Sequence, residues 1–268
     1  MDGTPEGREA SLRQVSVRRV EGADGDPCSS LQEHPVVVEQ VVDLVLNGRV
    51  LIRASCLPAS LEDLAVGFLA SEGLIEGAGA VSEVRVAAEG KTVEVRADVD
   101  PDRLVLFGER RATSSCCGGG VSGAADGIRP VESQARFRPE DLADRMRDLL
   151  DGSALFRDTG GVHAAAVTDG RTLDAFAEDI GRHNAVDKAI GQCLRRGTAP
   201  GDRALLVTGR TSADLAAKAA RVGLPVIVGR GAVTSRAIEV AAAAAVALVG
   251  FARAGRMNVY TAAWRLGL

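Results

Sequence analysis

The C-terminal part of the sequence alternates short apolar runs with helical patterns, and this order constrains the fold more than any other feature. The apolar runs, each short enough for a buried strand, cover residues 204–208, 225–228 and 247–251. Thr211 and Asp214 cap a predicted helix after the first run, and another helix crosses Ile238 and Val240 after the second. Strands joined by helices run parallel with right-handed crossovers. We therefore expect an α/β layered domain in this half of the chain.

Two hairpins are predicted in the first half of the chain. Residues 36–57 are rich in β-branched side chains around Asn47-Gly48, a dipeptide that tolerates the positive φ angles of a tight turn. Residues 81–97 alternate around Glu89-Gly90. These hairpins, with a helix between them, predict a smaller α+β lobe.

The elements divide the chain into four segments. The other predicted elements are a helix that Ser60 and Asp63 cap and Gly73 ends, helices at 139–150 and 184–196, and strands at 162–167 and 172–177. We expect a loose tail over residues 1–30, the smaller lobe over 31–110, a glycine-rich cysteine loop and linker over 111–136, and the α/β domain over 137–268.

Composition argues against several classes of protein. A formal net charge of -4 and an aromatic content of 3% argue against a general nucleic-acid binder. The most apolar run, residues 238–251, is too short for a membrane span of about 20 residues, and residues 1–30 lack the apolar stretch of a signal peptide. Five cysteines, an odd number, fit reduced thiols. We expect a soluble cytoplasmic protein that binds neither membranes nor nucleic acid.

Two adjacent thiols, Cys116 and Cys117, lie between a Thr/Ser run and three glycines. Such a composition predicts an exposed loop, where an ionised thiol can reach another molecule. A linker with incidental cysteines and a strained disulfide between neighbours are the alternatives; adjacent thiols chelate zinc poorly. Cys193 falls on the apolar face of its helix as a small core residue, and we assign no chemistry to Cys56 or Cys28.

Two polar segments frame the predicted strands of the second half. Residues 160–165 contain His163, which can equally be a satisfied core residue. Residues 178–188 place His183 among an acid, an arginine and an asparagine at the start of a helix, where free N–H groups attract anions. The alternatives are a pocket for a phosphorylated ligand and ordinary capping by Asp179 or Asn184.

A third segment, residues 250–261, follows the last buried strand. Ligands of open α/β sheets bind at the carboxyl ends of strands, and Arg253 and Arg256 there could hold phosphates. A solvated hairpin turn with surface arginines is the alternative. Arg210 and Arg230 follow the other two buried strands, so we expect a basic rim at this edge of the sheet.

In combination, five motifs in order resemble the FdhD family, the formate dehydrogenase accessory sulfurtransferases. The resemblance spans residues 33–264 and is carried by residues 67–73, 113–116, 160–165, 179–188 and 250–261. It implies that Cys116 carries a persulfide, with Cys117 as the alternate. It also implies that a cofactor is held by Phe251, Ala252, Arg253, Ala254, Gly255 and Arg256. We expect His183, with the polar cluster around it, to bind the phosphates of the same cofactor.

The resemblance implies a sulfur carrier. Such proteins take persulfide sulfur from a cysteine desulfurase and pass it to the molybdenum cofactor, Mo-bis(molybdopterin guanine dinucleotide), which activates formate dehydrogenase. It further implies a three-layer, cytidine-deaminase-like C-terminal domain and a homodimer. The zinc chemistry of deaminases is not expected, because Ala164 and Ala165 follow His163 and the chain has no C-x-x-C pair.

The cysteine motif departs from the family pattern, Cys-Gly-x-Cys-Gly. Cys117 replaces the first glycine and Gly119 occupies the position of the second cysteine. Adjacent cysteines do not readily form a relaxed disulfide. Two functions therefore stay open: a sulfurtransferase with an altered motif, and a chaperone that binds the molybdenum cofactor without carrying sulfur.

Overall fold

The larger domain is built on a six-stranded sheet with the strand order β12-β11-β10-β9-β7-β8. The computed structural model describes residues 10–22, 28–87, 89–112 and 128–268. The strands are β7 (His163–Thr168), β8 (Leu173–Asp179), β9 (Ala204–Val207), β10 (Val226–Gly229), β11 (Ala247–Arg253) and β12 (Arg256–Val259). β9, β10 and β11 are parallel, as the sequence predicts, and β7 is antiparallel to β9.

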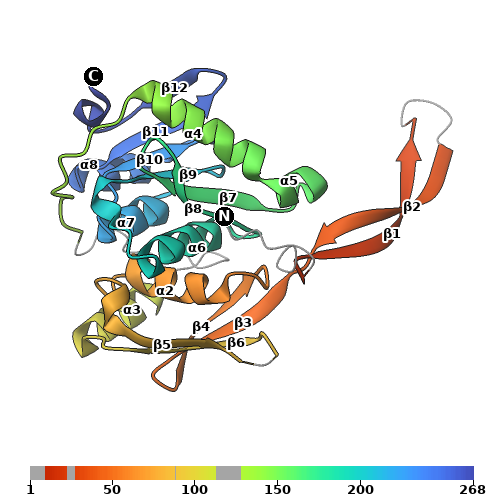
Figure 1. Ribbon diagram of the computed structural model, residues 1–268, viewed down its shortest axis with the longest axis horizontal. Helices are drawn as coiled ribbons and strands as arrows, with labels where there is room; N and C mark the ends of the chain where they lie inside the picture. The colour runs from red at the N-terminus through yellow and green to blue at the C-terminus, as the bar shows by residue number, and fades with distance from the viewer. Residues whose placement is uncertain (1–9, 23–27, 88, 113–127) are drawn as a thin grey trace.

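Helices cover both faces of this sheet (Figure 1). The helices are α4 (Pro139–Gly152), α5 (Ala154–Thr159), α6 (Arg182–Arg195), α7 (Ala213–Arg221) and α8 (Ser235–Ala243). The apolar sides of α6, α7 and α8 share one core with one face of the sheet, and α4 packs on the other face. The α/β class is therefore confirmed, with three layers. The closer likeness to cytidine deaminases stays a prediction.

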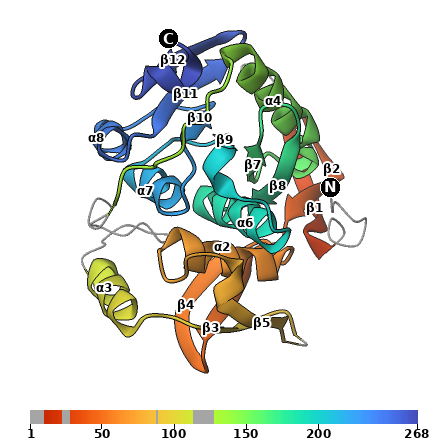
Figure 2. The ribbon, with the colours of Figure 1, turned by 60° about the vertical axis from the view of Figure 1, so that its left-hand side comes forward.

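The smaller lobe has a four-stranded sheet with the order β4-β3-β6-β5. Its elements are β3 (Gln40–Leu46), β4 (Arg49–Cys56), α2 (Leu61–Ser71), β5 (Val81–Val86), β6 (Thr92–Ala97) and α3 (Pro101–Ala112). Short 3-10 turns lie at Ala78–Ala80, Pro200–Asp202 and Ala263–Leu266. Figure 2 shows α2 between the small sheet and α6, so this helix joins the lobe to the larger domain.

A two-stranded ribbon extends away from both domains (Figure 1). It consists of β1 (Leu12–Glu21) and β2 (Cys28–Val37), paired antiparallel along their full length. The prediction of a loose tail over residues 1–30 is therefore wrong for these strands, because the apolar residues of the ribbon's base pack into a small cluster with the body of the protein. β2 also crosses the predicted boundary at residue 31. The other proposed segment boundaries stay predictions.

Local chemistry explains where the predicted turns hold and where they fail. Asn47 and Gly48 adopt positive φ angles of 49° and 81°, which confirms the first hairpin. Ser60 does not cap α2 as predicted: its φ is 51° and its side chain makes no capping hydrogen bond. The residue that precedes α7 is Ser212 rather than Thr211.

In the described part of the chain, no helix is both long and apolar enough to span a bilayer.

Candidate functional site

The polar motifs meet at one edge of the large sheet. The parallel strands β9, β10 and β11 end there, and because β7 is antiparallel to β9, β7 begins and β8 ends at the same edge. The segments at this edge are residues 160–163, 179–183, 208–212, 229–234 and 250–253. Strand direction alone therefore brings together segments that lie far apart in the sequence.

Glycines let the edge loops approach each other closely. A side chain at Gly209 would lie 3.3 Å from Cβ of Arg182 and 3.5 Å from Nδ1 of His163. A side chain at Gly231 would lie 2.8 Å from the carbonyl oxygen of Gly209, closer than real Cβ contacts allow. The N–H of Phe251 donates to the carbonyl of Gly231 at 3.0 Å. The five segments thus form one continuous row along the edge.

The N-terminus of α7 opens into this row. Its N-cap residue, Ser212, makes no side-chain capping bond, so the first N–H groups of the helix have no partner of that kind. Nε2 of His183 lies 3.4 Å from Oγ of Ser212. Oγ1 of Thr211 is fully buried and has no hydrogen-bond partner among the described residues. Uncapped N–H groups at a helix start are suited to an anion such as a phosphate.

Arginines rather than histidines supply the positive charge of the site. Burial, with Lys218 and Arg182 nearby, lowers the pKa of His183 to about 3. Burial and Arg182 also lower the pKa of His163. Both imidazoles are therefore neutral at pH 7. Arg182 lies near both, and its buried Nε has no hydrogen-bond partner in the described chain.

The predicted basic rim is present at the sheet edge. Arg210 and Arg230 are exposed directly after β9 and β10, and Arg253 is exposed at the end of β11. With Arg182, they place four guanidinium groups along the row of loops. The local charge is therefore positive although the whole chain is acidic.

The stretch from Phe251 to Arg256 is a hairpin tip between β11 and β12. Ala254 and Gly255 form the turn with φ angles of 51° and 73°, and Arg253 faces Arg256 across it. Both arginines are exposed, and within the described chain neither has a carboxylate partner. The predicted alternative, a hairpin turn with surface arginines, describes the local structure correctly. It does not exclude a ligand, and a cofactor contact stays a prediction.

Two neighbouring residues of this hairpin differ in exposure: the side chain of Phe251 is exposed and that of Ala252 is buried. Phe251 has a left-handed backbone with φ of 53°, and its ring is exposed with the Arg253 guanidinium 5.8 Å from its centroid. A bulky residue in this region is strained, and such strain gathers at functional sites. Ala252, by contrast, is buried in the core under α4, so it can offer a ligand only its backbone.

The other polar residues of the 178–188 motif join the two domains. Asp179 is fully buried, forms an ion pair with Lys188 at 2.6 Å and accepts hydrogen bonds from the N–H groups of Leu57 and Gly181. Asn184 donates to the carbonyl of Ser55. The motif thus has two roles. Arg182 and His183 face the edge, whereas four other polar side chains contact the smaller lobe: Asp179, Asn184, Asp187 and Lys188.

A second buried cluster lies where α2, α6 and α7 meet. Nζ of Lys218 lies 2.9 Å from carboxylate oxygens of both Glu72 and Asp187, and it donates to Oγ of Ser71 at 2.8 Å. Burial opposes the charge of Lys218, but Asp187 and Glu72 outweigh it and raise its pKa. The two lobes are therefore joined by buried ion pairs as well as by apolar contacts.

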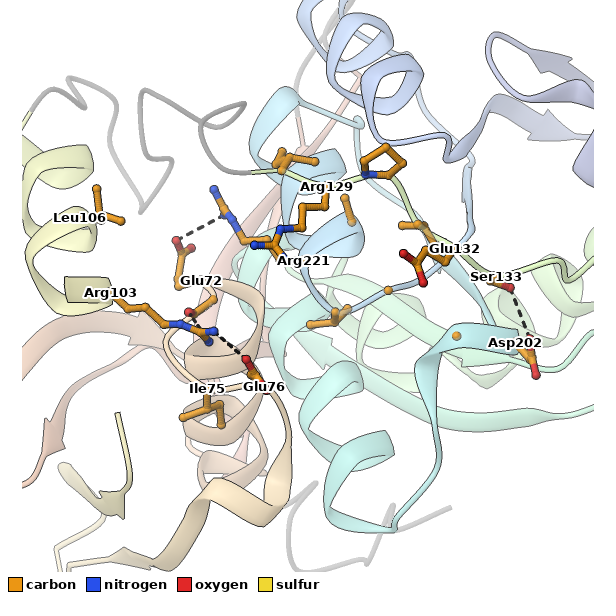
Figure 3. A pocket seen from close by; sticks show the side chains of 18 of the residues that line it. Glu72, Ile75, Glu76, Arg103, Leu106, Arg129, Glu132, Ser133, Asp202 and Arg221 are labelled. Carbon is orange, nitrogen blue, oxygen red and sulfur yellow. Dashed lines mark hydrogen bonds and ion pairs between the residues drawn. The ribbon is translucent and has the colours of Figure 1, made fainter. Parts of the chain in front are cut away.

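Cys116 and Cys117 lie outside the described residues, but the chain on either side of them is described. The preceding helix α3 and the following residues 128–133 line a cavity of about 1240 Å³ between the lobes (Figure 3). The ends of α2 and α7 complete its wall with Glu72 and Arg221, which lie 3.8 Å apart. This cavity lies at the C-terminal end of α7. The basic rim described above, called the arginine rim from here on, lies at the N-terminal end of this helix.

The described cysteines do not compete for the role of nucleophile. Cys56 and Cys193 are buried, and burial raises the pKa of their thiols to about 12 and about 11. Neither is a thiolate at neutral pH, and the prediction that Cys193 is a core residue is confirmed. Cys28 is exposed on the ribbon, away from the sheet edge.

Some residues of the site are absent from the sequence-based prediction. Arg182 belongs to a motif named there but received no role, and Ser212, Gly209 and Gly231 were not assigned to the site. The available signal was a glycine that recurs near the end of each short apolar run, as at Gly209, Gly229 and Gly250. Glycine at such positions allows a ligand or another backbone to come close.

Comparisons with known proteins agree on one family. The family model described as the FdhD/NarQ family matches residues 37–267. The sulfur carrier protein FdhD of Wolinella succinogenes is 37% identical over 265 residues, which cover 96% of this chain and 90% of that protein. The protein of the same name from Bacillus subtilis is 35% identical over 85% of this chain and 89% of its own length.

A solved structure extends the likeness to the fold. The crystal structure of a formate dehydrogenase accessory protein from Desulfotalea psychrophila superimposes with a TM-score of 0.76 and 26% sequence identity. The match covers 94% of this chain and 99% of that one.

Proposed function

Because this chain belongs to the FdhD/NarQ family, we propose that it carries sulfur to a molybdenum cofactor on which a formate dehydrogenase depends. A cysteine desulfurase is the proposed donor, and the bis(guanine dinucleotide) form of the cofactor is the proposed cargo. The observation that carries the proposal is the row of glycine loops and arginines at one sheet edge, beside the uncapped N-terminus of α7.

We propose that the arginine rim, together with Arg256 on the same hairpin, binds the dinucleotide phosphates. Arg253 and Arg256 face each other on an exposed tip and can each form paired hydrogen bonds with phosphate oxygens. Arg182 and the first N–H groups of α7 can receive a further phosphate, with neutral His183 holding Ser212 in place. The exposed ring of Phe251 offers a flat apolar surface beside them.

Sulfur loading is the proposed task of Cys116. Its thiolate attacks the terminal sulfur of the donor's persulfide, so a new S–S bond forms as the donor cysteine leaves as a thiolate. Transfer to the cargo then breaks the S–S bond of Cys116. The thiol is restored, and the cargo's reduced metal supplies the two electrons that the sulfur atom takes up.

We assign the two proposed tasks to different ends of α7, and the arrangement of the described residues supports this assignment. The residues on either side of the thiol segment line the cavity between the lobes, and the proposed phosphate grip lies about 13 Å away along a helix of nine residues. Cys116 follows Ala112, the last residue of α3, by four residues, so covalent length keeps their Cα atoms within about 14 Å. Donor and cargo can therefore approach from different sides.

A cofactor chaperone that carries no sulfur is the second candidate function. The missing second cysteine of the family motif favours it, since Gly119 stands at that position. Both candidates use the same arginine rim, so only the thiol chemistry separates them.

Intact mass after loading distinguishes the two candidates. The purified protein is incubated with a cysteine desulfurase and cysteine, and we expect a gain of one sulfur atom per chain. Cys116→Ser should abolish the gain, whereas the matched control Cys28→Ser should keep it. No gain in the unaltered protein would favour the chaperone, and loss in Cys117→Ser alone would name the neighbouring thiol as the carrier.

Substitutions in the hairpin arginines should weaken nucleotide binding without changing the sulfur loading of Cys116. The double substitution Arg253→Ala/Arg256→Ala removes two phosphate contacts, so we expect about tenfold to hundredfold weaker binding of guanosine diphosphate, measured by calorimetry. Loading of Cys116 should not change. Arg236→Ala is the control, because Arg236 is exposed and pairs with Glu239 on α8, away from the hairpin. Unaltered nucleotide binding in the double variant would contradict the proposed grip.

A further inference from the structure

The outer side of helix α3 carries two apolar residues between two acids. Val105 and Leu106 are 60% and 56% exposed, and the exposed residues Asp102 and Glu109 lie one helical turn away on either side of them. The opposite side of the helix is anchored by Phe107, whose buried ring packs edge-on against a phenylalanine ring of α2 with the centroids 5.9 Å apart. The apolar pair therefore faces outward in the folded protein.

The cavity beside α3 is acidic. Figure 3 shows Leu106 on one side of this cavity and Glu132 on the other. The two ends of α2 and α7 that reach the wall are C-terminal ends, which carry a partial negative charge. The wall holds five carboxylates, of Glu72, Glu76, Glu109, Glu132 and Asp202, and three guanidinium groups, of Arg103, Arg129 and Arg221.

The charge of this wall is opposite to that of the sheet edge. The arginine rim suits a cargo that carries phosphates, and the carboxylates around the cavity would repel the same phosphates. A protein that presents basic and apolar side chains would instead be attracted to this side. The two ends of α7 therefore favour partners of opposite charge.

We propose that the persulfide donor docks on α3 and the adjoining cavity wall, through a segment in which lysine or arginine side chains flank apolar ones. This inference rests on the proposed sulfur transfer, because the donor has to bring its terminal sulfur to Cys116. Covalent length keeps Cys116 within about 14 Å of the end of α3, so a donor that reaches the thiol also reaches this helix. The docking surface, called the donor surface below, consists of Asp102, Val105, Leu106, Glu109 and Glu132.

Loading of the full chain from two donors of different size tests the donor surface. A cysteine desulfurase supplied with cysteine has to dock, whereas glutathione persulfide is small enough to reach the thiol without docking. In both reactions the thiolate of Cys116 attacks the terminal sulfur, a new S–S bond forms, and the donor's own sulfur leaves as a thiolate. The rate at which the intact mass gains one sulfur atom is measured with each donor, with the desulfurase below saturation.

Two double variants separate the apolar contribution from the charged one. Val105→Ser/Leu106→Ser removes the apolar pair, and Glu109→Lys/Glu132→Lys reverses two charges. With the desulfurase, we expect each variant to load about tenfold or more slowly than the unaltered protein. Added salt should slow the unaltered protein but not the charge-reversed variant. With glutathione persulfide, both variants should load at least as fast as the unaltered protein.

Glu89→Lys is the matched control for charge reversal, and its loading should be normal with both donors. Glu89 is 81% exposed in the turn between β5 and β6, at the other end of this hairpin from the residues that lead into α3.

Each other outcome has a distinct meaning. Normal desulfurase loading of both double variants would overturn the donor surface and leave the proposed function intact. Equal slowing with both donors would also overturn it, since the loss would then lie in the thiol and not in docking. An unaltered protein that loads from glutathione persulfide alone would show that the desulfurase does not dock. Gain of sulfur from neither donor would overturn the proposed function itself.

Discussion

At the scale of single residues, burial sets the chemistry of the site more than residue type does. His183 is 8% exposed and Lys218 and Arg182 lie near it, so its imidazole stays neutral and acts as a hydrogen-bond partner of Ser212. The guanidinium of Arg182 lies near it. A histidine that sequence alone marks as a candidate anion ligand is thus a support for the helix start.

The neutrality of His183 predicts a specific acid sensitivity. Its pKa falls from 6.5 in the unfolded chain to about 3 in the fold, so only the unfolded state takes up a proton between these values. The stabilisation is complete above pH 6.5 and is lost as pH falls. Relative to His183→Asn, the unaltered protein should lose up to about 1.4 kcal/mol of unfolding free energy per pH unit there. Urea unfolding at several pH values measures the slopes.

His34→Asn is the control for this measurement, because His34 is exposed on the ribbon. Its slope should equal that of the unaltered protein. An equal slope for His183→Asn would show that His183 is not held neutral by the fold.

At the scale of elements, two glycines allow α2 and α6 to cross with backbone against backbone. A side chain at Gly67 would collide with the carbonyl of Asp187, and one at Gly191 would collide with the carbonyl of Asp63. Backbone cannot move aside as a flexible side chain can. The crossing therefore depends on both glycines, and through it the attachment of the smaller lobe.

Adding one methyl group at this crossing should separate the helices. Gly67→Ala and Gly191→Ala should each cost about 2 kcal/mol or more of unfolding free energy, by overpacking. Gly108→Ala on α3 is the matched control, since no atom lies within 4 Å of a side chain there. It should be neutral or stabilise by up to about 1 kcal/mol, as expected for alanine in a helix. Chemical denaturation measures all three, and a small cost at Gly67 would contradict the crossing.

Elements with strong local signals could be predicted from the sequence, and elements set by long-range contacts could not. Asn47-Gly48 fixes a hairpin by itself, and the buried strands of the large domain are short apolar runs. β12 has four residues, only half of them apolar, and exists because β11 lies beside it. Ser60 shows a capping pattern, yet tertiary packing gives it a left-handed backbone.

Helix α3 was not predicted, although the sequence contains the signals of a helix start. Pro101 stands at its first position, and Asp100 accepts a hydrogen bond from the N–H of Asp102, as a helix start requires.

For the site, strand order predicted which edge carries the arginines. It could not predict that α7 separates this edge from the cavity that α3 and residues 128–133 line, because that depends on how the two lobes pack.

At the scale of the whole molecule, buried charge joins the lobes. Lys218 on α7 contacts Glu72 from the smaller lobe and Asp187 on α6, and all three side chains are at most 3% exposed. Asp179 and Lys188 form a second buried pair that reaches Leu57 of the smaller lobe. The relative position of the cavity and the arginine rim is therefore fixed by ion pairs that water does not screen.

Removing the central cation should weaken the whole molecule. Lys218→Met leaves Glu72 and Asp187 buried without their shared partner, so we expect a loss of about 3–5 kcal/mol of unfolding free energy. Lys91→Met is the control, because the Lys91 side chain is 68% exposed. Thermal and urea unfolding measure both variants. A loss below about 1 kcal/mol for Lys218→Met would show that the lobes do not depend on this cluster.

The left-handed backbone of Phe251 also has a consequence for protein engineering. Glycine would adopt this conformation without steric conflict, so a search for heat-resistant variants should replace the phenylalanine early. If the exposed ring serves the cargo, those variants should survive heating and yet fail to support a dehydrogenase. Selection for thermal stability would then favour glycine at position 251, whereas selection for activation of the dehydrogenase would favour phenylalanine.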